Sequence, residues 1–584
     1  MGVLICSLFL PKSIQFNSPG IPDGKIITRL QSNRTIPPAE PPAPIRDSLT
    51  PPHIPTDNST LPGPFANDDE FCTQPLYGLG LPKSARPRFN SASPAATFKQ
   101  GSRLGHCGLE PPKMHTRYDN RGHVLDSTLW QVVDADQGND GLRGAVKAAI
   151  RDKILPNCVW IGTLGIPIDA LDGTKQKSDI EGTLANEYDM LTVFCSDKDF
   201  NCHYNHFCKQ ILWPVFHYQV PDSPKSKAYE DHSWKHYVHV NQAFAEKVVK
   251  NWKSGDTIWV HDYHLLLVPS MVRKKLPNAK IGFFLHVSFP SLEVFRCLAV
   301  RAELLEGILG ANLVGFQIPE YTQHFLESCS RILGVSVTTE GIVMQDRLVH
   351  VINSSIGIDP ISLNRNRCGQ EALQWLNILR DRLKGKKLIV ARDKLDQISG
   401  VRQKLLAYEL FLKKNPEWRA QTVLVQVAQS SGHNLAFDAN ISDIATRINS
   451  SWAGLAYQPV VYLTQGINDP QYLMLLIIAD ALLIMSQREG MNLTSHEYIF
   501  CQDGKICPSR KHGSLILSEF TGRSSLFRKS ALLVNPWDYI QCADAIKRAL
   551  EMGENERRSR WENLYQLVTT HTGCDWVSGC LFRL

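Results

Sequence analysis

The residue types best suited to chemistry lie in a turn between an apolar run and an amphipathic segment. The run Lys387–Ala391 is typical of a buried parallel strand. The segment after it carries leucines at helical spacing and meets Pro416 just past its end, which predicts a helix. A strand, a turn containing Gly400 and a helix direct backbone N–H groups at an anion, and Lys394 would add a cation. The pattern predicts a phosphate or nucleotide site, although other strand–helix turns of α/β proteins look similar.

Polar residues also follow two further predicted strands. Asp262 comes at the end of the strand beginning at Asp256, and His286 follows the apolar run 281–285. The carboxyl ends of successive parallel strands are where open α/β sheets bind ligands, so both side chains are candidate site residues. A histidine satisfied within the core is the alternative for His286.

One segment is rich in metal-ligand side chains. Its four candidate residues are Cys202, His203, His206 and Cys208. Their spacing matches no usual zinc pattern, and no second Cys/His pair follows at finger distance. We therefore expect no metal site, and we interpret the segment as part of a small-molecule site.

Composition excludes several classes of protein. The 584 residues are 43% hydrophobic and 21% charged, as in a globular protein of several domains. A net charge of +6 without a long Lys/Arg block argues against a nucleic-acid partner. No apolar run reaches the ~18–20 residues of a membrane span. The 15 scattered cysteines favour reduced thiols and a cytoplasmic location.

The turn at Lys394 resembles the RLDYxKG motif of the trehalose-6-phosphate synthases, which form glycosyltransferase family 20. These retaining enzymes transfer glucose from UDP-glucose to glucose 6-phosphate, and in active members the arginine and lysine of the motif hold the diphosphate. Here the frame reads KLDQISG, so Lys394 stands for the arginine and Ser399 for the lysine.

A second nucleotide motif is better preserved. The stretch REGMNLTSHEY resembles DGMNLVxxEY, with Glu489 in place of the aspartate that reaches the donor sugar. The resemblance implies that backbone amides of this stretch hold diphosphate and that Glu497 binds the ribose hydroxyls. The nucleotide-sugar residues implied are Lys394, Gly490, Met491, Asn492, Leu493 and Glu497.

The motifs of the acceptor site are mixed. VLICSLFLP resembles VVVSNRLP, and QVAQSSGHNL resembles QVAVPSRGDV; Phe9 and Gly432 fall on the arginines that grip the acceptor phosphate in active members. HYNHFCKQILWPVFHY resembles YYNxFSNxxLWPxFHY and keeps Tyr204 and Trp213, which implies aromatic acceptor-site residues. VHDYHL and GFFLHVSFP resemble family motifs in which the residues matching Asp262 and His286 contact the acceptor and donor sugars.

The resemblance implies an α/β fold in the GT-B arrangement, two doubly wound Rossmann-like domains facing a cleft. The expected divisions are 1–18, first strand of the N-terminal lobe; 19–125, disordered Pro/Ser-rich insertion; 126–360, N-terminal lobe on the acceptor side; 361–385, connection; 386–560, C-terminal lobe on the nucleotide-sugar side; and 561–584, a truncated helix crossing back. No cofactor is implied apart from residual UDP-glucose binding.

Three functional hypotheses follow. Several motif details look like those of the non-catalytic regulatory subunits of fungal trehalose synthase complexes. This favours a regulatory or scaffold subunit whose partners are catalytic trehalose-6-phosphate synthase and trehalose-6-phosphate phosphatase subunits. The alternative is an active UDP-forming synthase in which Arg392, Arg402 or Lys404 supplies the missing cations. A fragment with neither role is the third hypothesis.

Overall fold

The computed structural model describes residues 2–16, 130–169, 171, 173–219, 227–430 and 435–584. The insertion expected at 19–125 and the candidate residue Gly432 lie outside the described residues. The segment 17–129 leaves and rejoins the described chain at a two-stranded antiparallel pair, β2 (Lys12–Phe16) and β3 (Trp130–Asp134).

The N-terminal lobe is built on one sheet of nine strands. Its central strands run parallel, and only the last three pair in antiparallel fashion. In spatial order the strands are β5 (Met190–Thr192), β4 (Cys158–Thr163), β1 (Val3–Phe9), β6 (Thr257–His261), β7 (Lys280–Phe284), β8 (Leu313–Phe316), β11 (Leu348–Asn353), β10 (Gly341–Val343) and β9 (Ser336–Val337).

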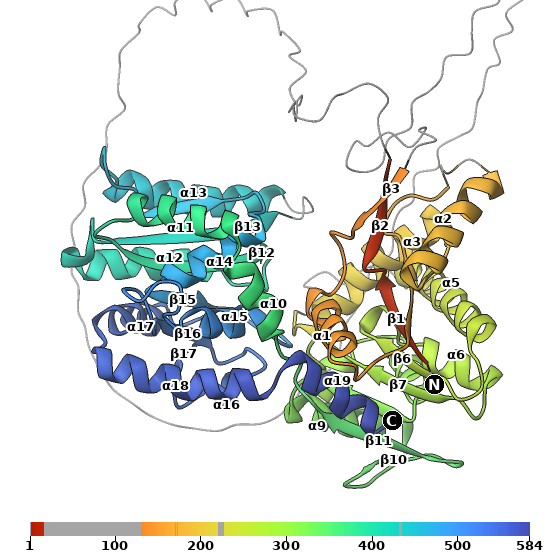
Figure 1. Cartoon of the computed structure of the whole chain (residues 1–584). Helices are drawn as coiled ribbons and strands as arrows, with labels where there is room; N and C mark the ends of the chain where they lie inside the picture. Colours follow the sequence, from red (N-terminus) through yellow and green to blue (C-terminus); the bar gives the residue numbers. More distant parts are fainter. Residues whose placement is uncertain (1, 17–129, 170, 172, 220–226, 431–434) are drawn as a thin grey trace, which may run out of the picture. The chain divides into compact units, whose positions relative to one another are not determined.

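Helices cover both faces of this sheet (Figure 1). They are α1 (Asp140–Arg151), α2 (Gly173–Tyr188), α3 (Asp197–Asn201), the π-helix η1 (Cys202–Leu212), α4 (Trp213–Phe216), α5 (Lys227–Asn251), the 3-10 turn η2 (Tyr263–Leu265), α6 (Val268–Lys275), α7 (Leu292–Phe295), α8 (Arg301–Ile308), α9 (Pro319–Leu333) and, from the end of the chain, α19 (Gly573–Phe582).

The C-terminal lobe holds a sheet of six parallel strands. Their order is β14 (Val460–Leu463), β13 (Thr422–Ser430), β12 (Lys387–Leu395), β15 (Ala481–Ile484), β16 (Ser514–Ser518) and β17 (Leu532–Val534). Its helices are α10 (Pro360–Arg367), α11 (Gln370–Arg382), α12 (Val401–Lys414), the 3-10 turn η3 (Pro416–Trp418), α13 (Leu435–Trp452), α14 (Asp469–Ile478), α15 (Leu493–Cys501), α16 (Ser524–Phe527), α17 (Tyr539–Glu551) and α18 (Glu554–Thr570).

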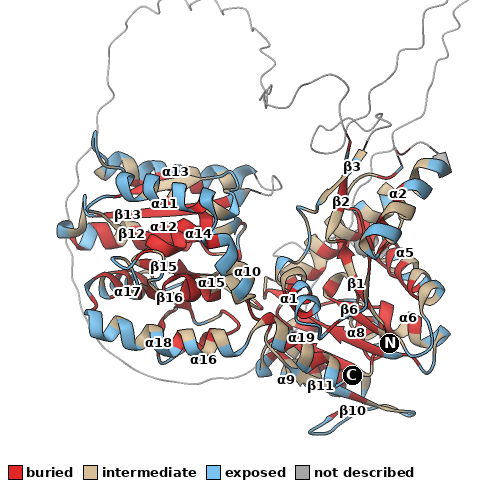
Figure 2. Cartoon of the chain, viewed as in Figure 1, coloured by how far each residue is buried: buried red, intermediate tan, exposed pale blue. Residues whose placement is uncertain are grey.

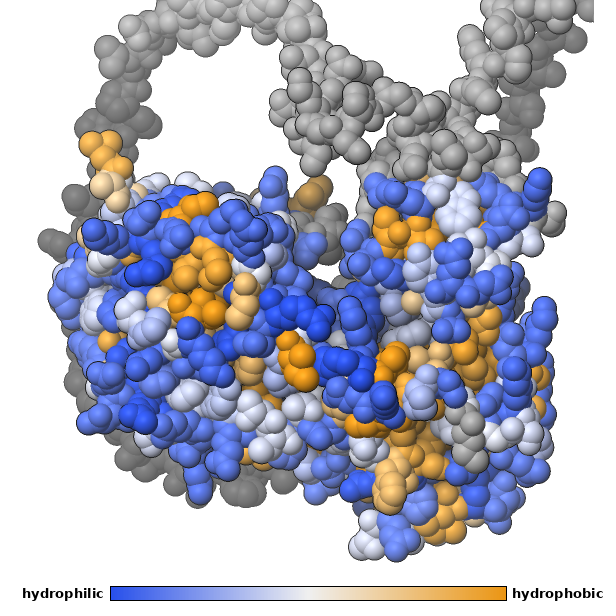
Figure 3. All heavy atoms as spheres, in the orientation of Figure 1, coloured by the Kyte–Doolittle hydropathy of each residue, from blue (hydrophilic) through white to orange (hydrophobic). Residues whose placement is uncertain are grey.

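Strand alternation divides the C-terminal core into two layers. Along β12, Leu388 and Val390 pack in one apolar cluster, whereas Ile389 and Ala391 pack in the other. Successive side chains of a strand point to opposite faces of the sheet. Because both faces of this sheet are covered, the strand is apolar at every position of the run. Figure 2 shows the buried strands between helices with exposed outer faces, and the face drawn in Figure 3 is largely hydrophilic with smaller apolar areas.

The last two helices belong to different lobes. Trp561 of α18 donates its indole N–H to the Ile499 carbonyl of α15, at 2.9 Å. The next helix, α19, begins with a capping box between Thr572 and Asp575 and places Trp576 5.0 Å from the ring of Trp259 in the N-terminal sheet. The chain thus returns to the lobe in which it began. No helix within the described ranges is long and apolar enough to cross a membrane.

Candidate functional site

The turn after β12 satisfies its own backbone groups. The strand continues through Leu395, four residues beyond the apolar run. The carboxylate of Asp396 then accepts the N–H groups of Ile398 at 3.0 Å and Ser399 at 2.7 Å. Gly400 follows with φ +71°, and a Cβ there would lie 1.9 Å from the Met485 carbonyl oxygen. The turn therefore offers an anion fewer free N–H groups than its strand–turn–helix pattern predicts, since Asp396 already occupies two.

Lys404 is engaged inside the lobe. Its ammonium lies 2.5 Å from the Asp393 carboxylate and donates to the Ser399 carbonyl at 3.2 Å, and both charged side chains are at most 5% exposed. Gln426 donates to the other Asp393 oxygen at 2.8 Å. Breaking such a buried pair leaves an uncompensated charge, so Lys404 does not supply the free cation that the active-synthase hypothesis needs. Lys394, by contrast, is exposed.

The start of α15 is organised by the side chain of Glu489. Ser486 and Asn492 donate to its Oε2 at 2.7 and 3.0 Å, and burial raises the pKa of this carboxyl. Asn492 also caps the helix by accepting the Ser495 N–H at 3.0 Å. The first N–H groups of a helix have no partner within it, so those near Leu493 keep the capacity to bind an anion. Gly490 is required, because a Cβ would lie 2.6 Å from the His286 carbonyl oxygen.

Glu497, one turn further along α15, has a partner of its own. The Tyr472 hydroxyl donates to Glu497 Oε2 at 2.6 Å. Arg392 stacks its guanidinium 4.2 Å from the Tyr472 ring centroid and interacts electrostatically with Glu497. Burial raises the pKa of the Glu497 carboxyl, and the Arg392 charge opposes that rise. Arg392 therefore already interacts with Tyr472 and Glu497. Arg402, the other arginine considered, is exposed on α12.

Phe9 closes the end of β1 with an aromatic cluster. Its ring meets the rings of Phe200 and Tyr204 edge-on, with centroids 5.9 and 5.4 Å apart. A Cβ on Gly165 would approach the Phe9 ring to 3.1 Å, so the main chain also packs against it. Phe9 is 7% exposed. An apolar, edge-to-face ring cluster offers no charge-assisted donor to a phosphate dianion.

The acceptor-type residue Tyr204 lies in the π-helix η1, and Trp213 begins α4 directly after it. In this helix residues five apart share a face, which is why Tyr204 and Lys209 come together. The Lys209 ammonium lies 5.3 Å from the Tyr204 ring centroid and 4.4 Å from that of Trp213. Burial and the nearby Lys394 charge lower the pKa of Lys209 to about 8. Sequence reasoning missed Lys209, although it replaces the second asparagine of the YYNxFSNxxLWP motif.

Asp262 adopts a strained backbone at the end of β6. Its φ is +73°, a left-handed conformation unusual for a residue other than glycine and often associated with function. The carboxylate accepts the Tyr263 N–H at 3.0 Å together with the amides of His286 and Val287. Burial nevertheless raises the pKa of Asp262 to about 6.

His286 is tied into a core network. Its Nε2 lies 3.2 Å from His261 Nδ1, and its Nδ1 lies 3.5 Å from the Gln317 amide. Burial lowers the pKa of His286 to about 3, so the imidazole stays neutral. Both ring nitrogens are engaged, which is the arrangement expected of a satisfied core histidine.

Comparison with known proteins identifies the family. The model of glycosyltransferase family 20 matches residues 115–584. The chain belongs to glycosyltransferase family 20. The solved structure of the N-terminal domain of Candida albicans trehalose-6-phosphate phosphatase is similar with TM-score 0.70 and 36% identity, covering 76% of this chain and 93% of that one. The trehalose-6-phosphate synthase OtsA is similar with TM-score 0.66 and 30% identity, over 76% and 92%. These likenesses confirm the GT-B fold.

Among curated relatives of this family-20 chain, the Saccharomyces cerevisiae trehalose synthase complex regulatory subunit TPS3 is 46% identical over 484 residues, 82% of this chain and 45% of the relative. The 56 kDa subunit of alpha,alpha-trehalose-phosphate synthase from the same yeast is 37% identical over 434 residues, 73% of this chain and 85% of the relative. The chain spans about half the length of several of the relatives it matches, TPS3 included.

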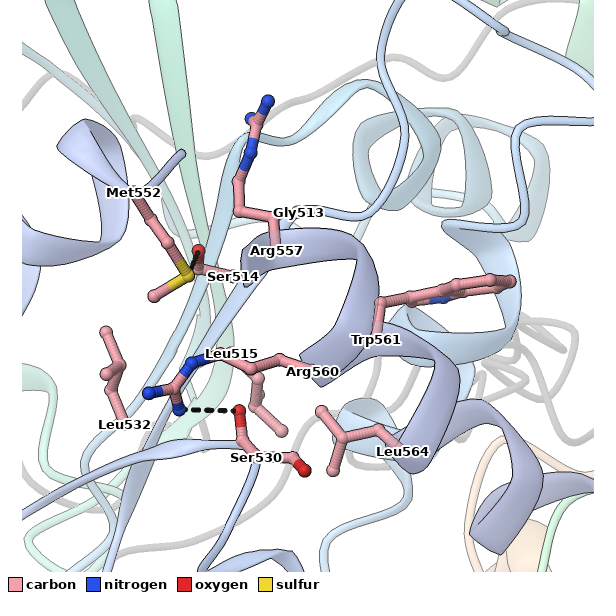
Figure 4. A pocket seen from close by; sticks show the side chains of 10 residues that line it. All are labelled: Gly513, Ser514, Leu515, Ser530, Leu532, Met552, Arg557, Arg560, Trp561 and Leu564. Atoms are coloured by element: carbon pink, nitrogen blue, oxygen red, sulfur yellow. Dashed lines mark hydrogen bonds between the residues drawn. The ribbon is translucent and has the colours of Figure 1, made fainter. Parts of the chain in front are cut away.

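Three family-20 motif residues of the N-terminal lobe, Phe9, Asp262 and His286, lie at or just after the ends of parallel strands. The pKa of Lys209 in the N-terminal lobe responds to the charges of Lys394, Asp262 and Asp396. Residues of the acceptor-type and nucleotide-type motifs therefore interact electrostatically. Gly432 lies outside the described residues. The small hollow in Figure 4 is elsewhere: its lining includes Arg560, which donates to the Ser530 carbonyl at 3.3 Å, and a cavity of about 10 Å³ holds at most about one water.

Proposed function

We propose that this chain is a regulatory or scaffold subunit of a trehalose synthase complex whose own glucosyltransferase site is degenerate. The observation that carries the proposal is Phe9, a buried ring packed among Phe200 and Tyr204 where the family motif has a phosphate-binding arginine. A guanidinium binds phosphate through paired, charge-assisted hydrogen bonds, and a phenyl ring has none to offer.

The nucleotide side supports the same proposal. Ser399 stands where the motif has lysine. Two neighbouring cations are occupied, Lys404 by Asp393 and Arg392 by Tyr472 and Glu497. Lys394 and Arg402 remain exposed. Losing one preorganised donor to developing charge typically costs about 10²–10³ in rate. Because donor and acceptor positions are both affected, we expect turnover by the chain alone to be negligible.

The partners proposed are catalytic trehalose-6-phosphate synthase and trehalose-6-phosphate phosphatase subunits. The support is similarity to two yeast proteins named as regulatory subunits of the trehalose synthase complex, TPS3 at 46% and TSL1 at 44% identity. A cytoplasmic location is part of the proposal, supported by the 13 cysteines of the described ranges, all of which are free thiols.

Weak UDP or UDP-glucose binding is also proposed, because the capped start of α15 and Glu497 are kept. Calorimetric titration with UDP tests this directly. Glu497→Gln should remove the binding while preserving the side-chain volume, whereas Glu562→Gln on the exposed face of α18 should leave it unchanged. Binding that survives Glu497→Gln would place the nucleotide elsewhere.

An assay of UDP release with UDP-glucose and glucose 6-phosphate tests the regulatory role. The expected result is no turnover by the chain alone, together with co-purification of the chain with separately expressed synthase and phosphatase subunits. Robust turnover that Glu497→Gln eliminates would overturn the regulatory proposal. Inactivity without association would leave the fragment hypothesis.

One observation favours the second candidate, an active synthase. Lys209 brings a partly buried positive charge beside Tyr204 and Trp213, close enough for its pKa to respond to Lys394. If this lysine compensates for the missing arginines, Lys209→Met should remove turnover in the same assay. Under the regulatory proposal there is no turnover for this substitution to remove.

A further inference from the structure

A second cluster of chemically capable side chains lies where α5 packs against α3 and the start of η1; α3 and α5 are labelled in Figure 1. His232 and His236 are four residues apart on α5, so they share one face of that helix. The opposing residue is Cys202, the first residue of η1. One ligand-type atom from each of Cys202, His232 and His236 lies within 4.8 Å of the others.

His236 is arranged as a metal ligand would be. Its Nδ1 pairs with Asp199 Oδ1 at 2.5 Å, its side chain is 9% exposed, and its buried Nε2 has no hydrogen-bond partner among the described residues. Leaving a buried ring nitrogen unpaired is costly, which calls for an explanation such as an ion. A carboxylate on one imidazole nitrogen fixes the tautomer and directs the other nitrogen at a metal.

Further contacts hold Asp199 in this orienting role. Its Oδ1 also lies 3.4 Å from His239 Nδ1, and its Oδ2 accepts the Ser196 hydroxyl at 2.7 Å. The group of potential ligands that contains Cys202 and His232 does not include Asp199, which forms a second group with His236 and His239. Asp199 is therefore a positioning residue, and the donor set consists of one sulfur and two imidazole nitrogens.

We propose that Cys202, His232 and His236 bind a zinc ion, oriented by Asp199 and completed by water. Thiolate and imidazole are the ligands that zinc prefers, and three protein ligands with one open position form a known zinc arrangement. His232 is exposed, which gives the ion a path of entry. This proposal differs from the expectation, drawn from the sequence, that the segment binds no metal. Of the four candidate residues in that segment, only Cys202 belongs to the proposed site.

The contacts of His203 and Cys208 show why the spacing of the four candidate residues did not predict the metal ligands. His203 and Cys208 are five residues apart on the π-helix, and their Nε2 and Sγ atoms lie 3.7 Å apart in the core. His203 stacks on Tyr237 with centroids 5.0 Å apart. Adjacent residues of η1 thus point to different neighbours, and within the described residues Cys202 is the member of this quartet that groups with His232 and His236. The ion fixes the start of η1, the helix that carries Lys209, against α5.

The test uses the full chain, freed of any tag and stripped of metal with a chelator. Zinc is titrated in competition with a chromophoric chelator, and cobalt is added separately as a spectroscopic probe. We expect one ion per chain and a thiolate-to-cobalt charge-transfer band that Cys202→Ser abolishes. Asp199→Asn should weaken zinc binding about 10–100-fold, and His232→Gln should weaken it further.

His239→Gln is the matched control, since His239 lies on the same helix but outside the three-ligand set; its zinc affinity should stay within about threefold of wild type. Zinc should raise the melting temperature of the wild-type chain and leave that of His232→Gln unchanged. No stoichiometric zinc, or zinc binding that survives both Cys202→Ser and His232→Gln, would overturn the proposal. Loss of binding in His239→Gln alone would do the same.

Discussion

Individual side chains account for most of the chemical difference between this chain and the family motifs. Phe9 is neutral, Ser399 cannot carry charge, and Lys404 is paired with Asp393 in the interior. Lys209 is the exception, because it adds positive charge beside Tyr204 where the motif has an amide. Neutral side chains therefore stand at two motif positions, while Lys404 is buried in an ion pair and Lys394 is exposed.

Phe9 should therefore behave as a core residue. Phe9→Ala removes a ring packed against Phe200 and Tyr204 and should lower the free energy of unfolding by about 3–5 kcal/mol. Urea denaturation measures this, with Phe582→Ala as the control because Phe582 is 93% exposed and should change stability by less than about 0.5 kcal/mol. Equal effects of the two substitutions would mean that Phe9 is free to serve a ligand.

At the scale of elements, tight backbone approaches hold the motif turns in place. Gly400 caps α12 in a left-handed conformation against the carbonyl of Met485, and Gly490 sits against the carbonyl of His286. Both turns depend on the absence of a side chain. Their glycines are explained by packing, whether or not a nucleotide binds.

Gly400 and Gly334 form a matched pair for testing this. Both have positive φ, +71° and +68°, but a Cβ on Gly334 meets nothing within 4 Å. Gly334→Ala should cost only the left-handed penalty of about 1–2 kcal/mol. Gly400→Ala should cost about 1–3 kcal/mol more, since the Met485 backbone must move. Denaturation curves measure the difference, and equal losses would contradict the close approach.

The loop after α15 is fixed by a buried ion pair. Arg367 on α10 makes paired hydrogen bonds to Asp503 at 2.9 and 2.7 Å, and neither side chain is more than 4% exposed. Asp503→Ala leaves the guanidinium buried and unpaired, so stability should fall by about 3–5 kcal/mol. Glu562→Ala breaks an exposed pair on α18 and should cost about 0.3–0.5 kcal/mol in the same measurement. A loss that small for Asp503→Ala would show that the pair is not maintained in solution.

For the molecule as a whole, buried imidazoles set the response to acid. Burial lowers the pKa of His217 to about 4 and those of His286 and His496 to about 3. Between pH 6.5 and these values the unfolded chain binds protons that the folded chain does not, so stability falls as pH falls, by up to about 1.4 kcal/mol per pH unit for each group. Asp262, with its pKa raised to about 6, opposes this in part by taking up a proton in the folded state.

Urea denaturation at about pH 7 and about pH 5 should therefore show a clear loss of stability in acid. His217→Gln should flatten that dependence, because the imidazole that donates to the Trp213 carbonyl at 2.7 Å no longer titrates. Stability that is equal at the two pH values would indicate that these histidines are hydrated and free to ionise.

The sequence by itself determined the fold class and the motif positions, because apolar periodicity and turn residues act locally. The run Lys387–Ala391, Gly400 and the helix after it lie where the pattern predicts, and so does the α15 start around Gly490. The charge substitutions at Phe9, Lys394 and Ser399 are visible in the sequence alone. What they imply for function stays a proposal.

Only the tertiary structure decided which charges are free and which neighbours a side chain meets. Lys404, Arg392 and Lys394 look equivalent in the sequence, yet Lys404 is buried in an ion pair. Arg392 and Lys394 are both exposed, and Arg392 stacks on Tyr472. Lys209 meets Tyr204 because a π-helix aligns residues five apart, a geometry that ordinary helical spacing does not predict. Cys202 meets His236, 34 positions further along the sequence, for a different reason: long-range packing, which local patterns do not encode, brings α5 against η1.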